Sequence, residues 1–524
     1  MKVLIADSMA PECIDILKEP AGLTVDVKTG MSPAELKKCI GAYAGIVIRS
    51  ATKLTADILK KAAKLQVIGR AGTGLDNVDI AAATRAGIIV MNTPGGNTVS
   101  TAEHTFSMLL ALSRNIPQAH GSLQAGKWDK KSFKGVEVYN KVLGVVGLGK
   151  IGREVAQRAL GFGMKVLGFD PFITPDMAAK MKIKLVELDE LVSQADYITV
   201  HTPLNDHTRH MISTKQFKMM KPEVRLLNCA RGGIIDEKAL YLALKKGRVA
   251  GAALDVFEKE PPRGNPLLAL PNVVTTPHLG ASTEEAQVNV AVAIAHQIRD
   301  ALLNHTIRNA ANAPSLDGEI LKQLKPFLDL GEKIGELHAQ LLEGHIQEVT
   351  MEYSGKVNDY DTTAVSIAVI KGLLYPSLKE EVNYINAKVL AQNRGIRIAE
   401  TRLDQQEDFL SLIDVKVRSN QETRTIGGTV FGKNDYRVVR IDGYRLDTIP
   451  QGHMLFSTYK DAPGIIGRIG SILGNNRINI TNMSWGIDNK VALMALNTSK
   501  PVPARVREKL AAETRFTWCK TVNL

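Results

Sequence analysis

Short apolar runs alternate with helical stretches over residues 1 to about 97. The apolar runs are the expected strands, and they cover residues 3–6, 45–49, 65–69 and 88–91. Strands that alternate with helices in this way favour a parallel α/β domain. A helix with apolar periodicity is predicted next, at 100–114.

A second α/β unit is predicted from about residue 139 to 277. Its expected strands are 142–146, 165–169, 197–200, 226–228, 251–254 and 273–275. The stretch 282–305 predicts a helix that returns to the first domain. The first domain is therefore expected to be discontinuous, and its segments are expected at 1–97 and 282–312, around a second domain at 98–281.

The pattern changes after residue 309. A polar hinge at 309–314 leads to a helix that is expected to end near residue 342. Strands follow, and 427–431 and 436–441 look like an antiparallel pair with a short turn. A helix followed by antiparallel strands is typical of an α+β domain.

The α+β domain is expected at 313–450 and intervenes before a last domain at 451–524. That last part has the order βαββαβ of a ferredoxin-like motif. The fold class predicted for the chain is α/β, with two Rossmann-like or flavodoxin-like domains, an interdomain active-site cleft and two smaller α+β domains.

Length and charge narrow the class of protein. At 524 residues the chain is too long for one core, and no apolar run reaches the roughly 20 residues that span a bilayer. Residues 1–7 predict a strand and not a cleaved signal, so we expect a cytoplasmic protein without a membrane partner. The net charge is +12, but lysine and arginine are spread along the chain. This argues against a nucleic-acid partner and suits an anionic substrate.

The four cysteines predict neither a metal site nor a disulfide framework. Cys13, Cys39, Cys229 and Cys519 are scattered without a CxxC pair, and reduced thiols fit a cytosolic setting. No metal is therefore expected. Cys229 lies close before Arg231, so its alkylation would inhibit if the thiol were reactive; the sequence favours the alternative, a buried and inert thiol.

A dinucleotide-binding fingerprint lies between an apolar strand and a helix. Gly147, Gly149 and Gly152 have the spacing GxGxxG directly after the strand 142–146. The first glycine permits a tight turn, the second lets the backbone approach a pyrophosphate, and the third allows close packing of helix on strand.

The cofactor expected at this fingerprint is NAD. The next strand ends on Asp170, whose carboxylate can accept hydrogen bonds from ribose hydroxyls and would repel a 2′-phosphate. Pro171 and Phe172 follow, with no arginine to bind such a phosphate. NAD is therefore preferred over NADP.

Arg231, Glu260 and His278 are the parts that a hydride-transfer site needs. An imidazole can take a hydroxyl proton, and a carboxylate on its other ring nitrogen raises its proton affinity. A guanidinium can hold a carboxylate or polarise a carbonyl. Together these residues predict oxidation of a 2-hydroxy acid, whereas each alone would equally suit a structural role.

Several motifs carry a resemblance to a known family. They are RAGTGLDNVD at 70–79, MNTP at 91–94, GLGKIG at 147–152, NCARGG at 228–233, ALDVF at 253–257 and PHLGA at 277–281. Over about residues 3–310 the sequence resembles the D-2-hydroxyacid dehydrogenases. With its tail, it resembles the long-form branch that acts on 3-phosphoglycerate and carries an intervening domain and an ACT domain.

The resemblance implies that Arg231, Glu260 and His278 are catalytic. It also implies cofactor contacts beyond the three glycines and Asp170. These further contacts are Lys150, Ile151, Thr202, Pro203, Cys229, Ala230, Asp255, His278, Gly280 and Ala281.

The substrate that the resemblance implies is 3-phosphoglycerate. Its implied contacts are Arg49, Arg70, Thr73, Gly74, Asn97 and, from a neighbouring subunit, Lys130. The two arginines would bind the phosphate, unless they are ordinary ion-pair residues. Related sequences often have arginine in place of Lys130, and lysine lacks the bidentate fork.

The resemblance also implies regulation and assembly. Tyr459, Asp461 and Asn479 match residues that bind L-serine as effector, whereas the alternative is that the ACT domain only dimerises. A homotetramer is implied, and Lys388 and Arg440 are candidate anion contacts in the intervening domain.

The predicted function is NAD-dependent oxidation of 3-phosphoglycerate to 3-phosphohydroxypyruvate, the first step of serine biosynthesis, with feedback inhibition by serine. Two alternatives are a hydroxypyruvate or glyoxylate reductase and an NAD-sensing binding protein of the corepressor kind. The ACT tail and the two arginines argue against the reductase. The complete set of Arg231, Glu260 and His278 argues against the corepressor, although corepressors can retain it.

Overall fold

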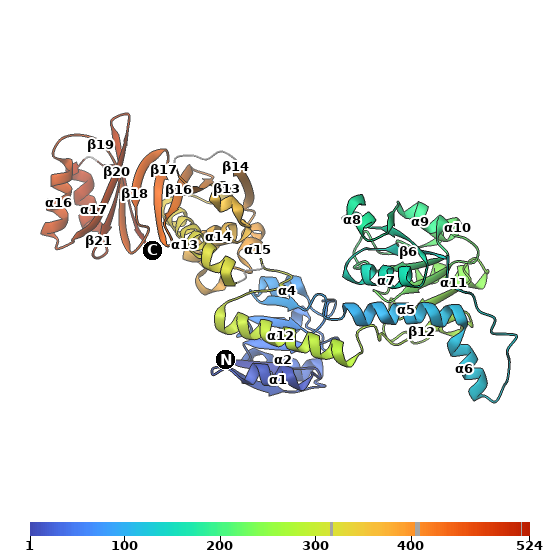
Figure 1. The fold of residues 1–524 in the computed structure, drawn as a ribbon. Coiled ribbons are helices and arrows are strands. Elements are labelled where there is room, and N and C mark those ends of the chain that lie inside the picture. The colour runs from blue at the N-terminus through green and yellow to red at the C-terminus, as the bar shows by residue number, and fades with distance from the viewer. Residues whose placement is uncertain (315–317, 404–408, 515) are drawn as a thin grey trace. The chain divides into compact units, whose positions relative to one another are not determined.

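The computed structural model describes residues 1–314, 318–403, 409–514 and 516–524 (Figure 1). They form two compact units. The first unit comprises Met1–Ser8, Ile14–Asn92 and Ile294–Leu524, and the second comprises Met9–Cys13 and Thr93–Ala293. Among the described residues, no helix is both long and apolar enough to cross a membrane.

The N-terminal part of the first unit is a parallel five-stranded sheet. In spatial order its strands are β2 (Thr24–Val27), β1 (Lys2–Ile5), β3 (Gly45–Ile48), β4 (Val67–Arg70) and β5 (Ile89–Asn92). Its helices are α1 (Pro11–Lys18), α2 (Pro33–Cys39), α3 (Ala56–Leu59) and α4 (Ile80–Arg85). All four residues of β3 are buried, as expected for a parallel strand that is covered on both faces. The sequence missed β2, because this edge strand is short and only partly buried.

The end of α12 (Glu284–Asn304) packs on this first sheet, as the sequence predicted. Side-chain atoms of Ile298 lie 3.5 Å from the place of a Cβ on Gly45 and 2.7 Å from that on Gly69. A larger residue at Gly69 would collide with this helix, so the glycine lets helix and sheet approach closely.

The linker that follows α12 was predicted as a polar hinge, but the structure pairs it with β5. The N–H of Ala311 donates to the carbonyl of Val90 at 2.8 Å, and the Asn312 side chain accepts from the N–H of Val90 at 2.9 Å. The same side chain donates to the Ile88 carbonyl at 2.9 Å. The linker therefore covers the outer edge of the sheet.

The second unit contains a parallel seven-stranded sheet. Its order is β12 (Val273–Thr275), β11 (Gly251–Leu254), β10 (Arg225–Asn228), β9 (Tyr197–Val200), β6 (Val142–Val146), β7 (Lys165–Phe169) and β8 (Lys184–Leu185). The strand order reverses between β6 and β9, which is the switch point where doubly wound sheets bind ligands. The predicted strands are confirmed, and the sequence missed only the two-residue edge strand β8.

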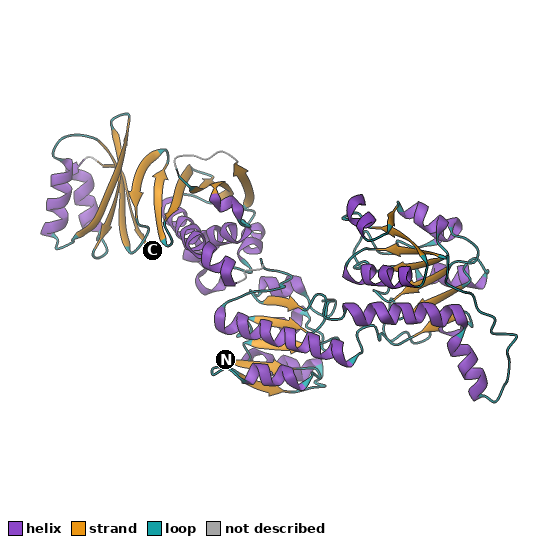
Figure 2. Ribbon diagram, viewed as in Figure 1, coloured by secondary structure: helices purple, strands orange, loops and turns teal. Residues whose placement is uncertain are grey.

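Helices cover this sheet, as Figure 2 shows. They are α5 (Thr98–Arg114), α7 (Lys150–Gly161), α8 (Pro175–Lys180), α9 (Leu188–Gln194), α10 (Thr214–Met219) and α11 (Glu237–Lys245). In contrast, α6 (Ile116–Gln124) projects away from the sheet and has no buried residue (Figure 1). Several start at a side-chain cap: Thr174 accepts from the N–H of Met177 before α8, and Asp236 accepts from that of Ala239 before α11. Such caps satisfy N–H groups that have no partner within the helix.

The intervening part of the first unit is an α+β domain. Its sheet order is β14 (Arg397–Leu403), β13 (Ile346–Gly355), β15 (Ser411–Ser419), β16 (Thr423–Phe431), β17 (Asp435–Ile441) and β18 (Tyr444–Thr448). Its helices are α13 (Gly318–Leu341), α14 (Thr363–Leu378) and α15 (Ala387–Asn393). A Cβ on Gly335 of α13 would lie 2.1 Å from the Val369 carbonyl oxygen of α14. Glycine therefore brings the two backbones together.

The C-terminal part has the predicted βαββαβ order. Its elements are β19 (His453–Lys460), α16 (Ile465–Asn475), β20 (Ile480–Asp488), β21 (Val491–Thr498), α17 (Ala504–Thr514) and β22 (Phe516–Asn523). The sheet is antiparallel in the order β20-β21-β19-β22, and both helices lie on one of its faces (Figure 2). Leu455, Met494 and Leu510 are fully buried between them.

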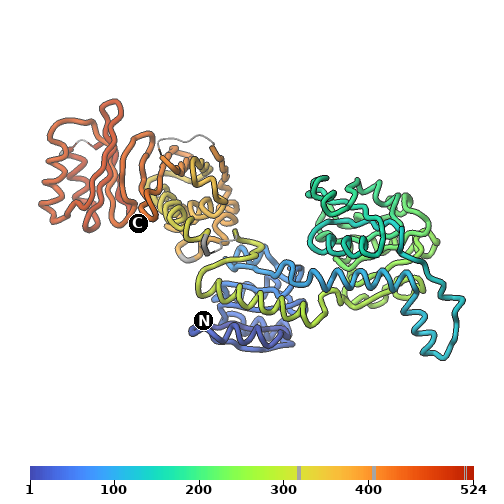
Figure 3. The backbone as a smooth tube through the Cα atoms, in the orientation of Figure 1, coloured from blue at the N-terminus to red at the C-terminus, as the bar shows by residue number. Residues whose placement is uncertain are grey.

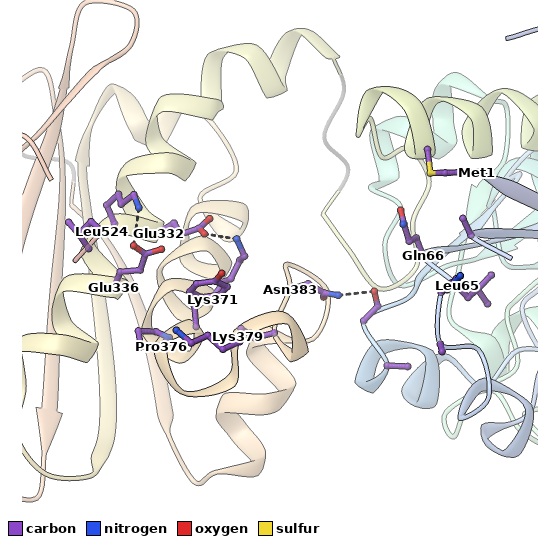
Figure 4. Close-up of a pocket in the computed structure, with 18 of the residues that line it drawn as sticks. Met1, Leu65, Gln66, Glu332, Glu336, Lys371, Pro376, Lys379, Asn383 and Leu524 are labelled. Atoms are coloured by element: carbon purple, nitrogen blue, oxygen red, sulfur yellow. Dashed lines mark hydrogen bonds and ion pairs between the residues drawn. The ribbon is translucent and has the colours of Figure 1, made fainter. Parts of the chain in front are cut away.

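A cavity of about 1460 Å³ lies in the first unit, lined by the N-terminal sheet domain and by α13 and α14. Figure 4 shows Lys371 directed at Glu332, with their charged atoms 2.5 Å apart. The Asn383 side chain donates to the Gly87 carbonyl at 3.1 Å across the same cavity. Its lining contains none of Arg231, Glu260 and His278.

Candidate active site

The glycine fingerprint forms a tight loop at the carboxyl end of β6. Gly147 has a φ of +95°, and a Cβ there would lie 2.7 Å from the carbonyl oxygen of His201, which follows β9. A Cβ on Gly152 would lie 2.0 Å from the Gly147 carbonyl oxygen. In contrast, apart from Gly149 and its two chain neighbours, no described residue has an atom within 4 Å of the place of a Cβ on Gly149. The loop is closed on its inner side and open over Gly149, as the approach of a pyrophosphate requires.

Asp170 and Thr202 lie at the strand ends beside this loop. Asp170 accepts hydrogen bonds from the N–H groups of Leu148 and Phe172, each at 2.8 Å, which fixes its carboxylate next to the loop. The Thr202 hydroxyl oxygen is buried and has no hydrogen-bond partner among the described residues. A buried hydroxyl without a partner is costly unless a ligand satisfies it. Both residues therefore fit a dinucleotide.

The remaining predicted cofactor residues begin α7 or follow strands of the same sheet at their carboxyl ends. Lys150 and Ile151 begin α7, Pro203 follows Thr202, and Cys229 and Ala230 follow β10. Gly280 and Ala281 belong to the turn after β12. Burial raises the pKa of the Cys229 thiol to about 12, so this thiol is unreactive and the alkylation alternative is disfavoured.

Asp255 braces the turn that carries His278. Its side chain is fully buried and accepts from the Thr276 hydroxyl at 2.6 Å and from the N–H groups of Leu279 at 2.7 Å and Gly280 at 2.9 Å. Burial works to raise the pKa of Asp255, but the hydrogen bonds from His104 and Thr276 outweigh it and lower the pKa. The carboxylate stays ionised and holds the turn in place.

His278 and Glu260 form a hydrogen-bonded pair. The Nδ1 atom of His278 lies 2.9 Å from the Oε2 atom of Glu260, and Glu260 also accepts from the N–H of Phe257 at 3.2 Å. The hydrogen bond to Glu260 raises the pKa of His278, against the effects of burial and of the Arg231 charge. Burial works to raise the pKa of Glu260, but the pairing with His278 lowers it overall.

The Arg231 loop packs directly against the segment that carries Glu260. The Arg231 Nη1 atom donates to the Ala230 carbonyl at 2.7 Å, and the Asn228 side chain donates to the Arg231 carbonyl at 2.9 Å. A Cβ on Gly232 would lie 2.0 Å from the carbonyl carbon of Phe257. Glycine at that position is therefore required for this contact.

Comparison with known proteins places this geometry in a family. Residues 106–280 match the model of the D-isomer specific 2-hydroxyacid dehydrogenase NAD-binding domain, and residues 323–442 match that of the D-3-phosphoglycerate dehydrogenase intervening domain. A D-3-phosphoglycerate dehydrogenase of Archaeoglobus fulgidus is 46% identical over 515 residues, 97% of each chain. The chain belongs to the D-3-phosphoglycerate dehydrogenase family. It is an NAD-dependent dehydrogenase of D-2-hydroxy acids.

Further similarities agree with this family. A D-3-phosphoglycerate dehydrogenase of Methanocaldococcus jannaschii is 43% identical over 527 residues and matches all of both chains. A D-lactate dehydrogenase of Aquifex aeolicus, solved with NAD and lactic acid, is 28% identical with a TM-score of 0.52. That similarity covers 60% of this chain and all of the other. NAD is therefore the cofactor of this dehydrogenase.

The predicted phosphate ligands of the dehydrogenase lie at adjacent strand ends in the first unit. Arg49 follows β3, and Arg70 ends β4 in register with Ile48. Gly72, with a φ of +138°, leaves room for a guanidinium, because a Cβ there would lie 1.8 Å from Nη1 of Arg70. Thr73 follows, and its carbonyl accepts from Asn92 at 2.5 Å. Gly74 is half-buried in the same loop.

Two other predicted substrate residues lie in the second unit. Asn97 immediately precedes α5 and donates to the Thr101 hydroxyl at 3.2 Å. Lys130 is exposed in the loop between α6 and β6, a loop that extends away from the sheet (Figure 3). Its Nζ atom lies 5.4 Å from the ring centroid of Trp128, whose side chain is exposed.

The predicted effector residues differ in their surroundings. Asp461, after β19, and Asn479, before β20, are exposed. In contrast, Tyr459 is buried, and its ring centroid lies 5.8 Å from that of Phe516. In the intervening domain, Arg440 donates to Asp414 at 2.9 Å, and Lys388 lies 3.9 Å from Glu400.

His104 is a site residue that the sequence did not reveal. It projects from α5, and its Nε2 atom lies 3.1 Å from both the Thr276 hydroxyl and the Asp255 carboxylate. The helix periodicity predicted α5, but only the fold brings this imidazole to a carboxylate far along the chain.

Proposed function

We propose that this dehydrogenase oxidises 3-phosphoglycerate to 3-phosphohydroxypyruvate. The observation that carries the proposal is the pair Arg49 and Arg70, whose strands end side by side. A terminal phosphate needs such cations, whereas a methyl or short aliphatic tail does not. The relatives that match the full length are named for the same phosphorylated acid.

The proposed chemistry divides the reaction among three residues. The fingerprint loop and Asp170 would hold NAD⁺, which would supply the acceptor for the hydride of the substrate's C2. His278 takes the proton of the C2 hydroxyl on its Nε2 atom, because Nδ1 is engaged by Glu260. The carboxylate of Glu260 stabilises the positive imidazole that forms. Arg231 holds the substrate carboxylate or the carbonyl oxygen that develops at C2.

Substrate positioning is assigned to the loops that carry Thr73, Gly74 and Asn97. Thr73 and Gly74 would offer backbone N–H groups to the substrate carboxylate, and Asn97 its side-chain amide. Within a homotetramer, Lys130 would reach the phosphate of the substrate that is bound to a neighbouring subunit. The exposed position of Lys130 supports this role.

The C-terminal domain is proposed to bind L-serine and to inhibit the reaction. The carboxylate of Asp461 suits an ammonium group, and the amide of Asn479 can both donate and accept. Both side chains are exposed, so they are accessible to a small amino acid. The buried Tyr459 would then support the site from the core.

NADH formation from 3-phosphoglycerate and NAD⁺ tests the proposal. We expect turnover with this acid, little with D-glycerate or with NADP⁺, and a decrease when L-serine is added. Arg49→Gln should lower kcat/KM for 3-phosphoglycerate at least about tenfold, because a charge-assisted hydrogen bond is lost, and leave the D-glycerate rate unchanged. Equal turnover of both acids would overturn the assigned substrate.

A further inference from the structure

Three loops of the nucleotide-binding unit bring an imidazole and two carboxylates together. His210, Asp236 and Glu258 each present one ligand atom, and these atoms all lie within 4.8 Å of one another. The residues are far apart in the sequence, so no local motif predicts the cluster. It is separate from the pair formed by His278 and Glu260.

The fold fixes the backbone on which two of these side chains stand. The N–H of His210 donates to the Gly233 carbonyl at 2.7 Å, and that of Asp236 donates to the Ile212 carbonyl at 3.0 Å. Ile212 and Ile235 form a parallel bridge between the same two segments. The two side chains are therefore held next to each other without any ligand.

The donor atoms retain the capacity to bind a cation. The Oδ2 atom of Asp236 accepts from the Ser213 hydroxyl at 2.8 Å, and Oδ1 accepts from the N–H of Ala239 at 3.0 Å. Each carboxylate oxygen has a second lone pair. The Nε2 atom of His210 and Oε1 of Glu258 are hydrogen-bonded at 3.0 Å, and a metal ion that coordinates a neutral imidazole and the carboxylate would replace this hydrogen bond after a small separation of the two atoms.

The local charge also favours a cation. The N–H of Glu258 donates to the Glu237 side chain at 2.5 Å, so a third carboxylate adjoins the cluster. The positive charge of Arg209 partly offsets this negative charge. Its Nη1 atom lies 3.5 Å from the place of a Cβ on Gly233, the residue whose carbonyl accepts from the N–H of His210. As an exposed side chain, it can turn into solvent.

We propose that His210, Asp236 and Glu258 form a binding site for a divalent transition-metal ion of the Zn²⁺ and Co²⁺ class. One imidazole and two carboxylates are typical protein ligands of such ions, with water completing the coordination. The side chains are about two-fifths exposed at His210 and Glu258, with 42% and 39%, which leaves room for that water.

A bound metal ion would affect the reaction through the backbone segments that carry its ligands. Glu258 lies just before Glu260, and Asp236 lies on the segment that continues from Arg231. A metal ion would join these two segments and hold the loop of Glu260 against that of Arg231. Bound metal is therefore expected to raise thermal stability, because it binds only the folded chain.

Calorimetric titration of Co²⁺ and Zn²⁺ into the full-length protein, stripped with a chelator, tests the site. We expect one ion per chain, a higher Tm, and a Co²⁺ spectrum without thiolate charge-transfer absorption. His210→Asn preserves the backbone, because Asn tolerates the positive φ of 52° at this position. We expect this variant and Glu258→Gln each to weaken binding at least about tenfold.

His207→Asn is the matched control, because His207 is exposed on the same loop as His210 but lies outside the cluster. The metal affinity of this variant should equal that of the wild type. Undiminished affinity in both cluster variants, a thiolate signature for bound Co²⁺, or no binding to the wild type would each overturn the proposal. The readouts are affinity and Tm, so a wrong substrate assignment would leave them unaffected.

Discussion

The Nδ1 atom of His278 lies 2.9 Å from the Oε2 atom of Glu260, and the His278 backbone has a φ of +57°. His278→Asn keeps this backbone conformation, which Asn adopts more readily than Ala, and removes the proton acceptor. We expect turnover to fall by at least about 10²–10⁴-fold. Steady-state NADH formation measures the loss, with an unchanged Tm as the control for folding. Near-normal turnover would exclude His278 as the base.

Glu260 is expected to set the pH range over which kcat/KM for oxidation rises. Its hydrogen bond raises the pKa of His278, and only the neutral imidazole can take a proton. The kcat/KM for oxidation should therefore rise with pH through this raised pKa, and reduction should fall through it. In Glu260→Gln the acid limb of oxidation should move to lower pH. A limb that stays in place would remove Glu260 from this role.

Gly152 and Gly161 provide a matched pair on one helix. A Cβ on Gly152 would lie 2.0 Å from the Gly147 carbonyl oxygen. In contrast, apart from its chain neighbours and the adjacent helix backbone, no described atom lies within 4 Å of the place of a Cβ on Gly161. Gly152→Ala should therefore disrupt the fingerprint loop and lower both Tm and NAD affinity. Gly161→Ala should leave NAD affinity unchanged and raise stability by up to about 1 kcal/mol. Fluorescence titration with NADH and thermal unfolding compare the two.

Asp170 is predicted to determine the preference for NAD. Asp170→Asn removes the charge that would repel a 2′-phosphate, and it keeps an oxygen acceptor for one of the two backbone N–H groups that Asp170 binds. We expect kcat/KM with NAD⁺ to fall about tenfold or more, as for a lost charge-assisted hydrogen bond. The value with NADP⁺ should fall less or rise. A parallel, equal loss with both cofactors would contradict the prediction.

His338 should make the intervening domain sensitive to acid. Burial lowers the pKa of His338 to about 3, while its Nε2 atom lies 2.9 Å from the Val415 carbonyl. The unfolded chain takes up this proton near pH 6.5 and the folded chain does not, so stability falls as pH decreases from about 6.5 towards 3. The slope from one such group is at most about 1.4 kcal/mol per pH unit. His338→Gln should reduce this slope in urea unfolding measured at several pH values.

The fold was largely predictable where apolar runs are long and complete. The runs at 142–146 and 165–169 coincide with β6 and β7, because strands buried on both faces have few polar positions. The edge strand β2 contains Asp26 and is partly exposed, so its sequence of apolar and polar residues does not differ from that of a loop. The domain boundaries drawn from these patterns stay predictions.

The candidate site was predictable only where a motif fixes the chemistry. Arg231, Glu260 and His278 could be named from the sequence, and the structure adds the hydrogen bond between the last two. The brace from His104 to Asp255 could not be read, since tertiary contacts between distant residues leave no local pattern. The roles of the predicted residues await the measurements above.

The linker pairing with β5 bears on how this chain can be shortened. Asn312 and its neighbours occupy the hydrogen-bonding groups along the open side of β5. A truncated dehydrogenase that ends soon after α12 would leave those groups bare, and a bare strand edge invites other chains to pair with it. A fragment that retains residues to 314 should remain monodisperse where one that ends at 305 aggregates.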